Sequence, residues 1–191
     1  MKLSVKLLAV ITIFLLSATS SYSQTNVVSR SSIATDILKV VEDYPNRFKN
    51  ITGELLVQNP QSSDYTCNLD IEEAEECIIT KYSAEHKEIC SWQALLLTTE
   101  NFNEAQRKFR SLFVQLNQLP VGSSFLNGKY ENPAEEKNFT SALLSVIPQN
   151  EVTKKLVVEI VLESHIMEWK VKLLVYDRER EDDERGAVIE R

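Results

Sequence analysis

Glycine and histidine are scarce in this chain of 191 residues, which has four glycines and two histidines. The glycines are too few and too scattered to build the glycine-rich loop that holds a phosphate group. His86 and His165 lie outside any pattern, such as His-x-His or Cys-x-x-Cys, that spaces ligands around a metal ion. We therefore predict no cofactor, no metal ion and no catalytic residue.

Basic residues are outnumbered by acidic ones. The chain has 21 lysines and arginines against 28 aspartates and glutamates, which gives a net charge of −7. Nucleic-acid binding depends on neutralising phosphates with basic side chains, so we expect no nucleic-acid partner. Net charge governs solubility and association rate more than the identity of a ligand, and it leaves the ligand open.

Long apolar runs are missing except near the N-terminus. Lys2 and Lys6 precede an apolar stretch, Leu7–Leu16, and small residues follow it up to Ser23. This pattern is typical of a cleaved secretory signal peptide over residues 1–23, and the stretch is shorter than the roughly 20 residues that a spanning helix needs. We predict an exported, soluble protein, periplasmic or extracellular, with no membrane span after signal removal.

What the sequence does contain is a recurring set of residues. Several pairs recur at an offset of 73 to 77 positions. A fixed period of this kind usually indicates a repeated supersecondary unit. The pairs are Pro45 and Pro120, Gly53 and Gly128, Asn59-Pro60 and Asn132-Pro133, Tyr65-Thr66 and Phe139-Thr140, and Trp92 and Trp169.

Apolar spacing predicts one helix and three antiparallel strands in each unit. Residues 33–44 and 105–119 place apolar side chains on one helical face. Stretches that alternate between apolar and polar residues, such as 65–71 and 167–175, are typical of half-buried strands.

The predicted fold class is therefore α+β, with two tandem αβββ repeats. The units are residues 33–100 and 101–176, forming one compact domain or two tightly packed halves. We expect the helices to pack on one face of antiparallel sheet and the other face to be solvated. Residues 24–32 are expected to be a flexible N-terminus and residues 177–191 a charged flexible tail.

All three cysteines lie in the first predicted unit. An exported protein can oxidise its thiols, so we predict a possible disulfide between Cys67 and Cys77, or between Cys77 and Cys90. Pairing of Cys67 with Cys90 is disfavoured because a strand separates them. The alternative is that all three are small apolar residues of the core.

The absence of a catalytic pattern favours a non-enzymatic binding module of the cell envelope or extracellular space, with a protein or envelope component as its partner. The candidate interaction surface consists of Thr66, Asn68, Asp70, Glu168, Lys170 and Lys172. One alternative is a small-ligand carrier or an enzyme with a cavity between helices and sheet, in which Glu159 and His165 would meet. A second alternative is a structural envelope component. The oligomeric state stays open.

Overall fold

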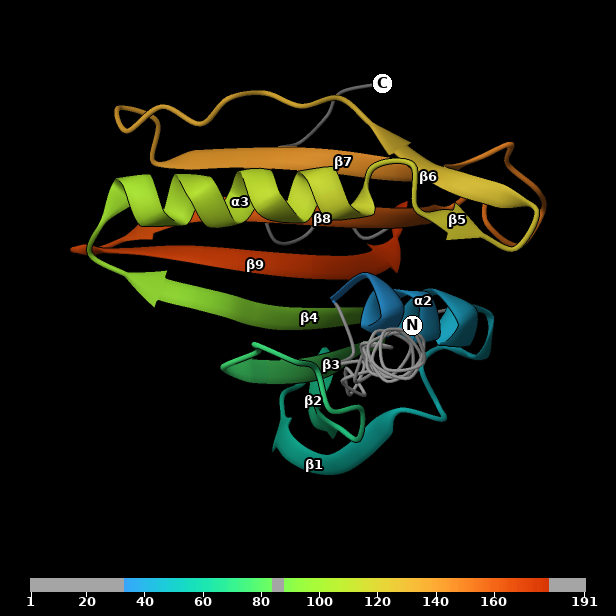
Figure 1. Ribbon diagram of the computed structural model, residues 1–191. Helices are drawn as coiled ribbons and strands as arrows, with labels where there is room; N and C mark the ends of the chain where they lie inside the picture. Colours follow the sequence, from blue (N-terminus) through green and yellow to red (C-terminus); the bar gives the residue numbers. More distant parts are fainter. Residues whose placement is uncertain (1–32, 84–87, 179–191) are drawn as a thin grey trace, which may run out of the picture. The chain divides into compact units, whose positions relative to one another are not determined.

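The computed structural model describes residues 33–83 and 88–178, which build one antiparallel sheet with two helices against it (Figure 1). The sheet has nine strands in the order β1-β2-β3-β4-β9-β8-β7-β6-β5. The strands are β1 (Thr52–Gln58), β2 (Ser62–Cys67), β3 (Glu76–Ser83), β4 (Glu88–Thr99), β5 (Pro120–Val121), β6 (Ser124–Gly128), β7 (Phe139–Ile147), β8 (Leu156–His165) and β9 (Glu168–Asp177).

The predicted fold class, α+β with two tandem αβββ repeats, is wrong. Four strands follow the first helix and five follow the second, and all nine belong to a single sheet, so the protein is mostly β. Alternation of apolar and polar residues predicts strands but does not show which strands pair. The last strands of the two halves, β4 and β9, pair with each other at the centre of the sheet.

The two helices are α2 (Ile33–Asp43) and α3 (Phe102–Leu116), and a single turn of 3₁₀ helix, η1 (Tyr44–Asn46), follows α2. Helix α3 begins at an asparagine cap, because Asn101 accepts hydrogen bonds from the backbone N–H groups of Asn103 and Glu104. Pro45 limits α2 by disfavouring helical geometry in the residue before it.

The core lies between the helices and one face of the sheet. Both helices lie on the same side (Figure 1), and their apolar stripes are buried in one cluster with inward-facing strand residues. From α2 these are Ile33, Ile37, Val40 and Val41, and from α3 they are Ala105, Phe109, Leu112, Phe113 and Leu116. Their strand partners include Ile79, Trp92, Ile160 and Leu173.

The face of the sheet away from the helices, the far face, is not uniformly solvated, contrary to our expectation. A second apolar cluster on β8 and β9 is buried there: Val157, Val161, Leu174 and Tyr176. Glu159 lies among them at 1% exposure, and its carboxylate accepts a hydrogen bond of 2.8 Å from the Tyr176 hydroxyl. The continuous apolar run of β8 is explained by burial on both faces.

Several predictions concern residues outside the described ranges. These are the signal peptide over residues 1–23, the N-terminal stretch 24–32, the tail from residue 179 onward, and His86. Within residues 33–83 and 88–178, neither helix has the length and apolar character that crossing a membrane requires.

Candidate functional site

The six residues of the predicted interaction surface fall into two separate groups. Thr66 and Asn68 bond to the edge strand β1, through Glu54 N (2.8 Å) and Thr52 O (3.2 Å) respectively, and Asp70 follows them in an exposed loop. Strands β3 and β4 separate this group from β9.

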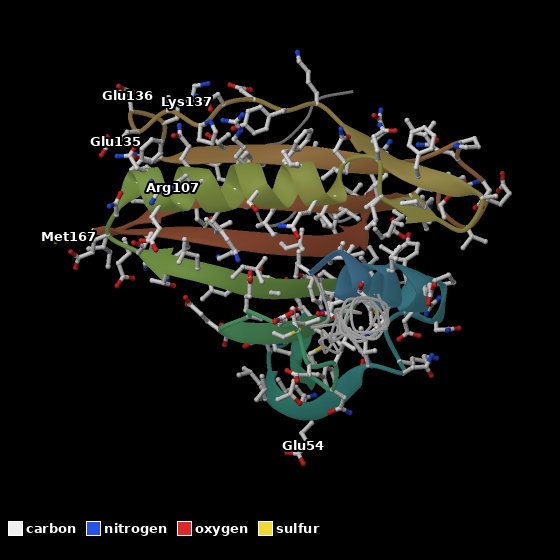
Figure 2. The ribbon with its side chains drawn as sticks, viewed as in Figure 1. Glu54, Arg107, Glu135, Glu136, Lys137 and Met167 are labelled. Atoms are coloured by element: carbon white, nitrogen blue, oxygen red, sulfur yellow. The ribbon has the colours of Figure 1, made fainter. Side chains whose placement is uncertain are left out.

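The second group lies on β9. Lys172 forms an ion pair of 2.5 Å with Glu163, Lys170 is half-buried, and Glu168 is exposed beside the hairpin tip. Figure 2 shows Met167 projecting at that tip and Glu54 projecting near β1, at different places on the sheet. The six residues therefore form two groups with β3 and β4 between them, and their role as an interaction surface stays a prediction.

The residues of the predicted enzymatic alternative do not meet. Glu159 is buried on the far face, whereas His165 is exposed at the end of the same strand. Six residues of strand separate them by about 20 Å. No group of three or more His, Cys, Asp or Glu residues in the described part of the chain could hold a metal ion.

The structure brings two of the three cysteines together. The β2–β3 register, in which Thr66 lies opposite Ile78, places Cys67 opposite Cys77. Cys90 lies opposite Lys81, while Cys77 lies opposite Ala94, four residues further along β4. Four strand residues span about 13 Å, which is beyond the reach of a disulfide. Of the two predicted pairings, Cys67 with Cys77 is the one that the fold allows, and the bond itself stays a prediction.

One concavity among the described residues is a cleft of about 330 Å³, which we call the loop cleft. It lies where the turn after α2 meets the loop before β8, with β4 and the end of β9 beneath. Its lining residues are Tyr44, Pro45, Arg47, Phe48, Cys90, Glu151, Val152, Lys154, Lys155 and Asp177.

The first wall of the loop cleft is a strained turn. Arg47 and Phe48 both have left-handed backbone conformations, with φ of 57° and 55°. This conformation costs a residue with a side chain about 1–2 kcal/mol. The two side chains of this turn point in different directions: Arg47 is exposed, whereas Phe48 is fully buried. Two strained residues in succession at a cleft are a reason to suspect function.

A buried carboxylate, that of Asp43, maintains this turn. It accepts hydrogen bonds from the Asn50 backbone N–H (3.0 Å), from the Asn50 side-chain amide and from the Asn46 amide (3.1 Å). The Phe48 N–H donates to the Asp43 carbonyl at 3.2 Å. These bonds hold the backbone of Arg47 and Phe48 in its strained conformation without the help of a ligand.

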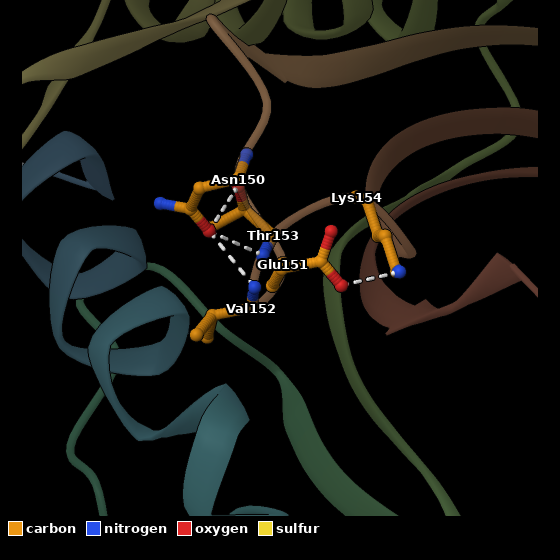
Figure 3. A network of polar contacts seen from close by, with 5 residues as sticks. All are labelled: Asn150, Glu151, Val152, Thr153 and Lys154. Carbon is orange, nitrogen blue, oxygen red and sulfur yellow. Dashed lines mark hydrogen bonds and ion pairs between the residues drawn. The ribbon is translucent and has the colours of Figure 1, made fainter.

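The second wall is the turn at residues 150–154, shown in Figure 3. The Asn150 side-chain oxygen accepts from the backbone N–H groups of Val152 and Thr153, both at 2.9 Å, and from the Thr153 hydroxyl. Asparagine favours such turns because its side chain bonds to the backbone two residues on. The turn leaves Val152 half exposed at the rim of the cleft.

Charge is concentrated at the rim and apolar surface at the floor. Lys154 pairs with Glu151 at 2.6 Å, and this hydrogen bond and charge lower the pKa of Glu151. The Tyr44 hydroxyl donates to Asp177 at 3.4 Å. Three basic side chains therefore face two acidic ones in the cleft of an otherwise acidic protein. The floor is aromatic, since Tyr44 and Phe48 pack edge to face.

A second concavity of about 330 Å³, the polar basin, lies on the far face of β2, β3 and β4. Asn59, Ser62, Asp64, Ile78, Thr80, Ser91 and Gln93 line it. The Thr80 hydroxyl donates to Asp64 at 2.7 Å. The basin contains hydroxyl, amide and carboxylate groups but no basic side chain, so it suits hydrogen bonding more than anion binding.

Sequence reasoning missed both concavities. Pro45-Asn46 and Asn150 are ordinary turn signals, but nothing local indicates that turns more than 100 residues apart form two walls of one cleft. Comparison of the chain with protein-family models, curated proteins and solved structures gives no match, so the geometry alone carries the functional argument.

Proposed function

We propose that this protein is an exported, non-enzymatic binding protein that takes a small amphipathic anion in the loop cleft. The observation that carries the proposal is the combination of an aromatic floor with a basic rim in one preorganised cleft. Small-ligand sites are typically concave, largely apolar and fitted with a few converging polar groups. This proposal keeps the predicted binding role and moves it from the sheet surface to the cleft.

The floor supports an apolar or aromatic group on the ligand. Tyr44 and Val152 offer partly exposed apolar surface, with Phe48 packed beneath Tyr44. A volume of about 330 Å³ is at the lower end of the range of small-molecule sites. A ligand the size of one or two fused rings is therefore the expected fit.

The rim supports a negative charge on the ligand. Arg47, Lys154 and Lys155 line the opening from both walls. A carboxylate or sulfonate held by such groups gains charge-assisted hydrogen bonds, which are stronger than neutral ones. The excess of acidic residues elsewhere repels anions, so the cleft is distinguished from the rest of the surface.

The test uses 2-naphthoate and its neutral analogue 2-naphthol with the protein lacking residues 1–23. Isothermal titration gives the two affinities, and amide chemical shifts locate the site. We expect naphthoate to bind at least tenfold more tightly, with shifts at residues 44–48 and 151–155. Lys154→Gln should weaken naphthoate binding by about tenfold, or roughly 1.4 kcal/mol, without affecting naphthol.

The matched control is Lys137→Gln. Lys137 forms an ion pair of 2.6 Å with Glu131, the same length as the Lys154–Glu151 pair, but away from the cleft. It should leave both affinities unchanged. Equal binding of naphthoate and naphthol, or shifts confined to other regions, would refute the proposal.

The polar basin supports a second candidate, a neutral saccharide as ligand. Its side chains supply both donors and acceptors, and no cation competes for them. Cellobiose should then shift the amides around Asp64 and Gln93, and Thr80→Val should abolish the effect while leaving naphthoate binding intact. Unchanged spectra with millimolar cellobiose would eliminate this candidate.

A further inference from the structure

We propose that Cys67 and Cys77 form a thiol–disulfide exchange pair, in which Cys67 is the attacking thiolate and Cys77 the resolving thiol. The reaction partner is a compound that contains a disulfide bond. This inference is independent of ligand binding in the loop cleft, from which both residues are absent.

The first support is the pairing geometry. Cys67 ends β2 and lies opposite Cys77 near the start of β3. Directly opposite residues of antiparallel strands have Cα atoms about 4.5–5.5 Å apart. A disulfide spans Cα separations of about 4.4–6.8 Å, so the bond can close without moving the strands.

The second support is a set of hydrogen-bond donors around the Cys67 sulfur. The Cys77 thiol, the backbone N–H of Leu69 and the indole N–H of Trp92 all approach it. The Cys77 hydrogen bond contributes most and lowers the pKa of Cys67 to about 6, although burial acts in the opposite direction. This lowered pKa favours the thiolate of Cys67, which is the nucleophilic form.

Trp92 adds a buried polar group beside the thiol pair. Its side chain is fully buried, and its indole N–H has no conventional hydrogen-bond acceptor in the described part of the chain. A buried donor without a partner costs about 1–3 kcal/mol. The two cysteine sulfurs lie near this N–H, and its influence lowers the pKa of both thiols, which favours their thiolate forms.

The two thiols are suited to different steps. The hydrogen bond that Cys77 donates to Cys67 and its own burial raise the pKa of Cys77, and the charge of neighbouring Glu76 adds to this. Cys67 is half-buried and followed by exposed Asn68, so a reagent can approach it from the end of β2. Cys67 therefore reacts first.

The exchange takes place in two successive attacks by thiolates. The Cys67 thiolate attacks one sulfur of the partner disulfide, forms a mixed disulfide and releases the other sulfur as a thiolate. The hydrogen bond to Cys67 and the charge of the Cys67 thiolate, which both raised the pKa of Cys77, are then gone, so Cys77 loses its proton to water and attacks the Cys67 sulfur. The second partner thiolate leaves. The two cysteines give up two electrons, and the partner disulfide becomes two thiolates, which take protons from water to give two thiols.

The first experiment measures the pH dependence of alkylation by iodoacetamide, read at each cysteine by peptide mass spectrometry. We expect half-maximal reactivity of Cys67 near pH 6, against about 8.5 for an ordinary thiol. Cys77→Ala should move the midpoint upward by at least one pH unit, and Trp92→Phe by less. Cys90→Ser is the matched control and should leave the profile unchanged.

The second experiment treats the reduced protein with glutathione disulfide. The wild-type protein should form the Cys67–Cys77 disulfide and release two glutathione molecules, whereas Cys77→Ser should stop at a mixed disulfide on Cys67. A wild-type midpoint near 8.5 would overturn the proposal. So would a stable mixed disulfide on the wild-type protein, or an internal disulfide that glutathione does not exchange, which indicates a purely structural cross-link.

Discussion

The two halves of the sheet differ in burial and in regularity: the β1–β4 side lies at one end of the strand order and the β6–β9 side at the other. Seven consecutive residues of β8, Leu156 to Leu162, are buried, whereas five consecutive residues of β1, Glu54 to Gln58, are exposed. The β7–β8 register is regular, while the β1–β2 register is interrupted twice. The β1–β4 side also contains the strained turn, the thiol pair and the polar basin. Burial is therefore more continuous on the β6–β9 side, whereas the loop cleft combines residues from both sides.

The largest difference should appear when equivalent apolar side chains are truncated on the two sides. Ile160 on β8 is fully buried, and Ile160→Ala should lower the free energy of unfolding by about 3–4 kcal/mol because it leaves a cavity. Leu56 on β1 is half exposed, and Leu56→Ala should cost less than about 0.5 kcal/mol. Urea unfolding with unchanged m-values measures both, and similar losses would break the comparison.

A smaller effect should follow from removing the buried carboxylate that maintains the strained turn. Asp43→Ala leaves the Asn50 N–H and two side-chain amides without their acceptor, which should cost about 2–3 kcal/mol. Glu42→Ala is the matched control, since it removes the same charge from an exposed neighbour and should cost less than about 0.5 kcal/mol. A loss for Asp43→Ala no greater than that of the control would show that the turn does not depend on this carboxylate.

The smallest change in the free energy of unfolding should follow from relieving backbone strain with glycine at two positions, only one of which lines the loop cleft. Arg47 and Gln118 both have positive φ, 57° and 70°, one on each side of the molecule. Glycine accepts this conformation, so Arg47→Gly and Gln118→Gly should each raise the free energy of unfolding by about 0.5–1 kcal/mol. Naphthoate binding should fall in Arg47→Gly alone. Equal binding in the two variants would remove the functional reason for strain at the cleft.

Local features of the fold could be predicted from the sequence. The apolar stripe from Ile33 to Val41 and the capping pattern at Asn101 specify helices through nearest-neighbour contacts. The pairing of β4 with β9 could not be predicted, because alternation indicates a strand but not which strand lies beside it. That missing information made the two-repeat interpretation of the recurring residues wrong.

The candidate sites were predictable in part. The cross-strand placement of Cys67 and Cys77 follows from a hairpin between them, which local pattern does indicate. The loop cleft combines residues 44–48 with residues 151–155, and no sequence signal connects segments so far apart. The strain at Arg47 and Phe48 was equally hidden, because neither residue type favours a left-handed backbone.

The central β4–β9 pair has a consequence for the order of events during biosynthesis. Ser91 lies opposite Tyr176, 85 residues further along the chain, so the middle of the sheet cannot close until β9 has been made. Until then β4 keeps an unpaired edge, and contacts over such sequence distances form slowly. The centre of the sheet is therefore the last part of the β4–β9 region that can form during synthesis, and until then its two halves can fold only as separate hairpins.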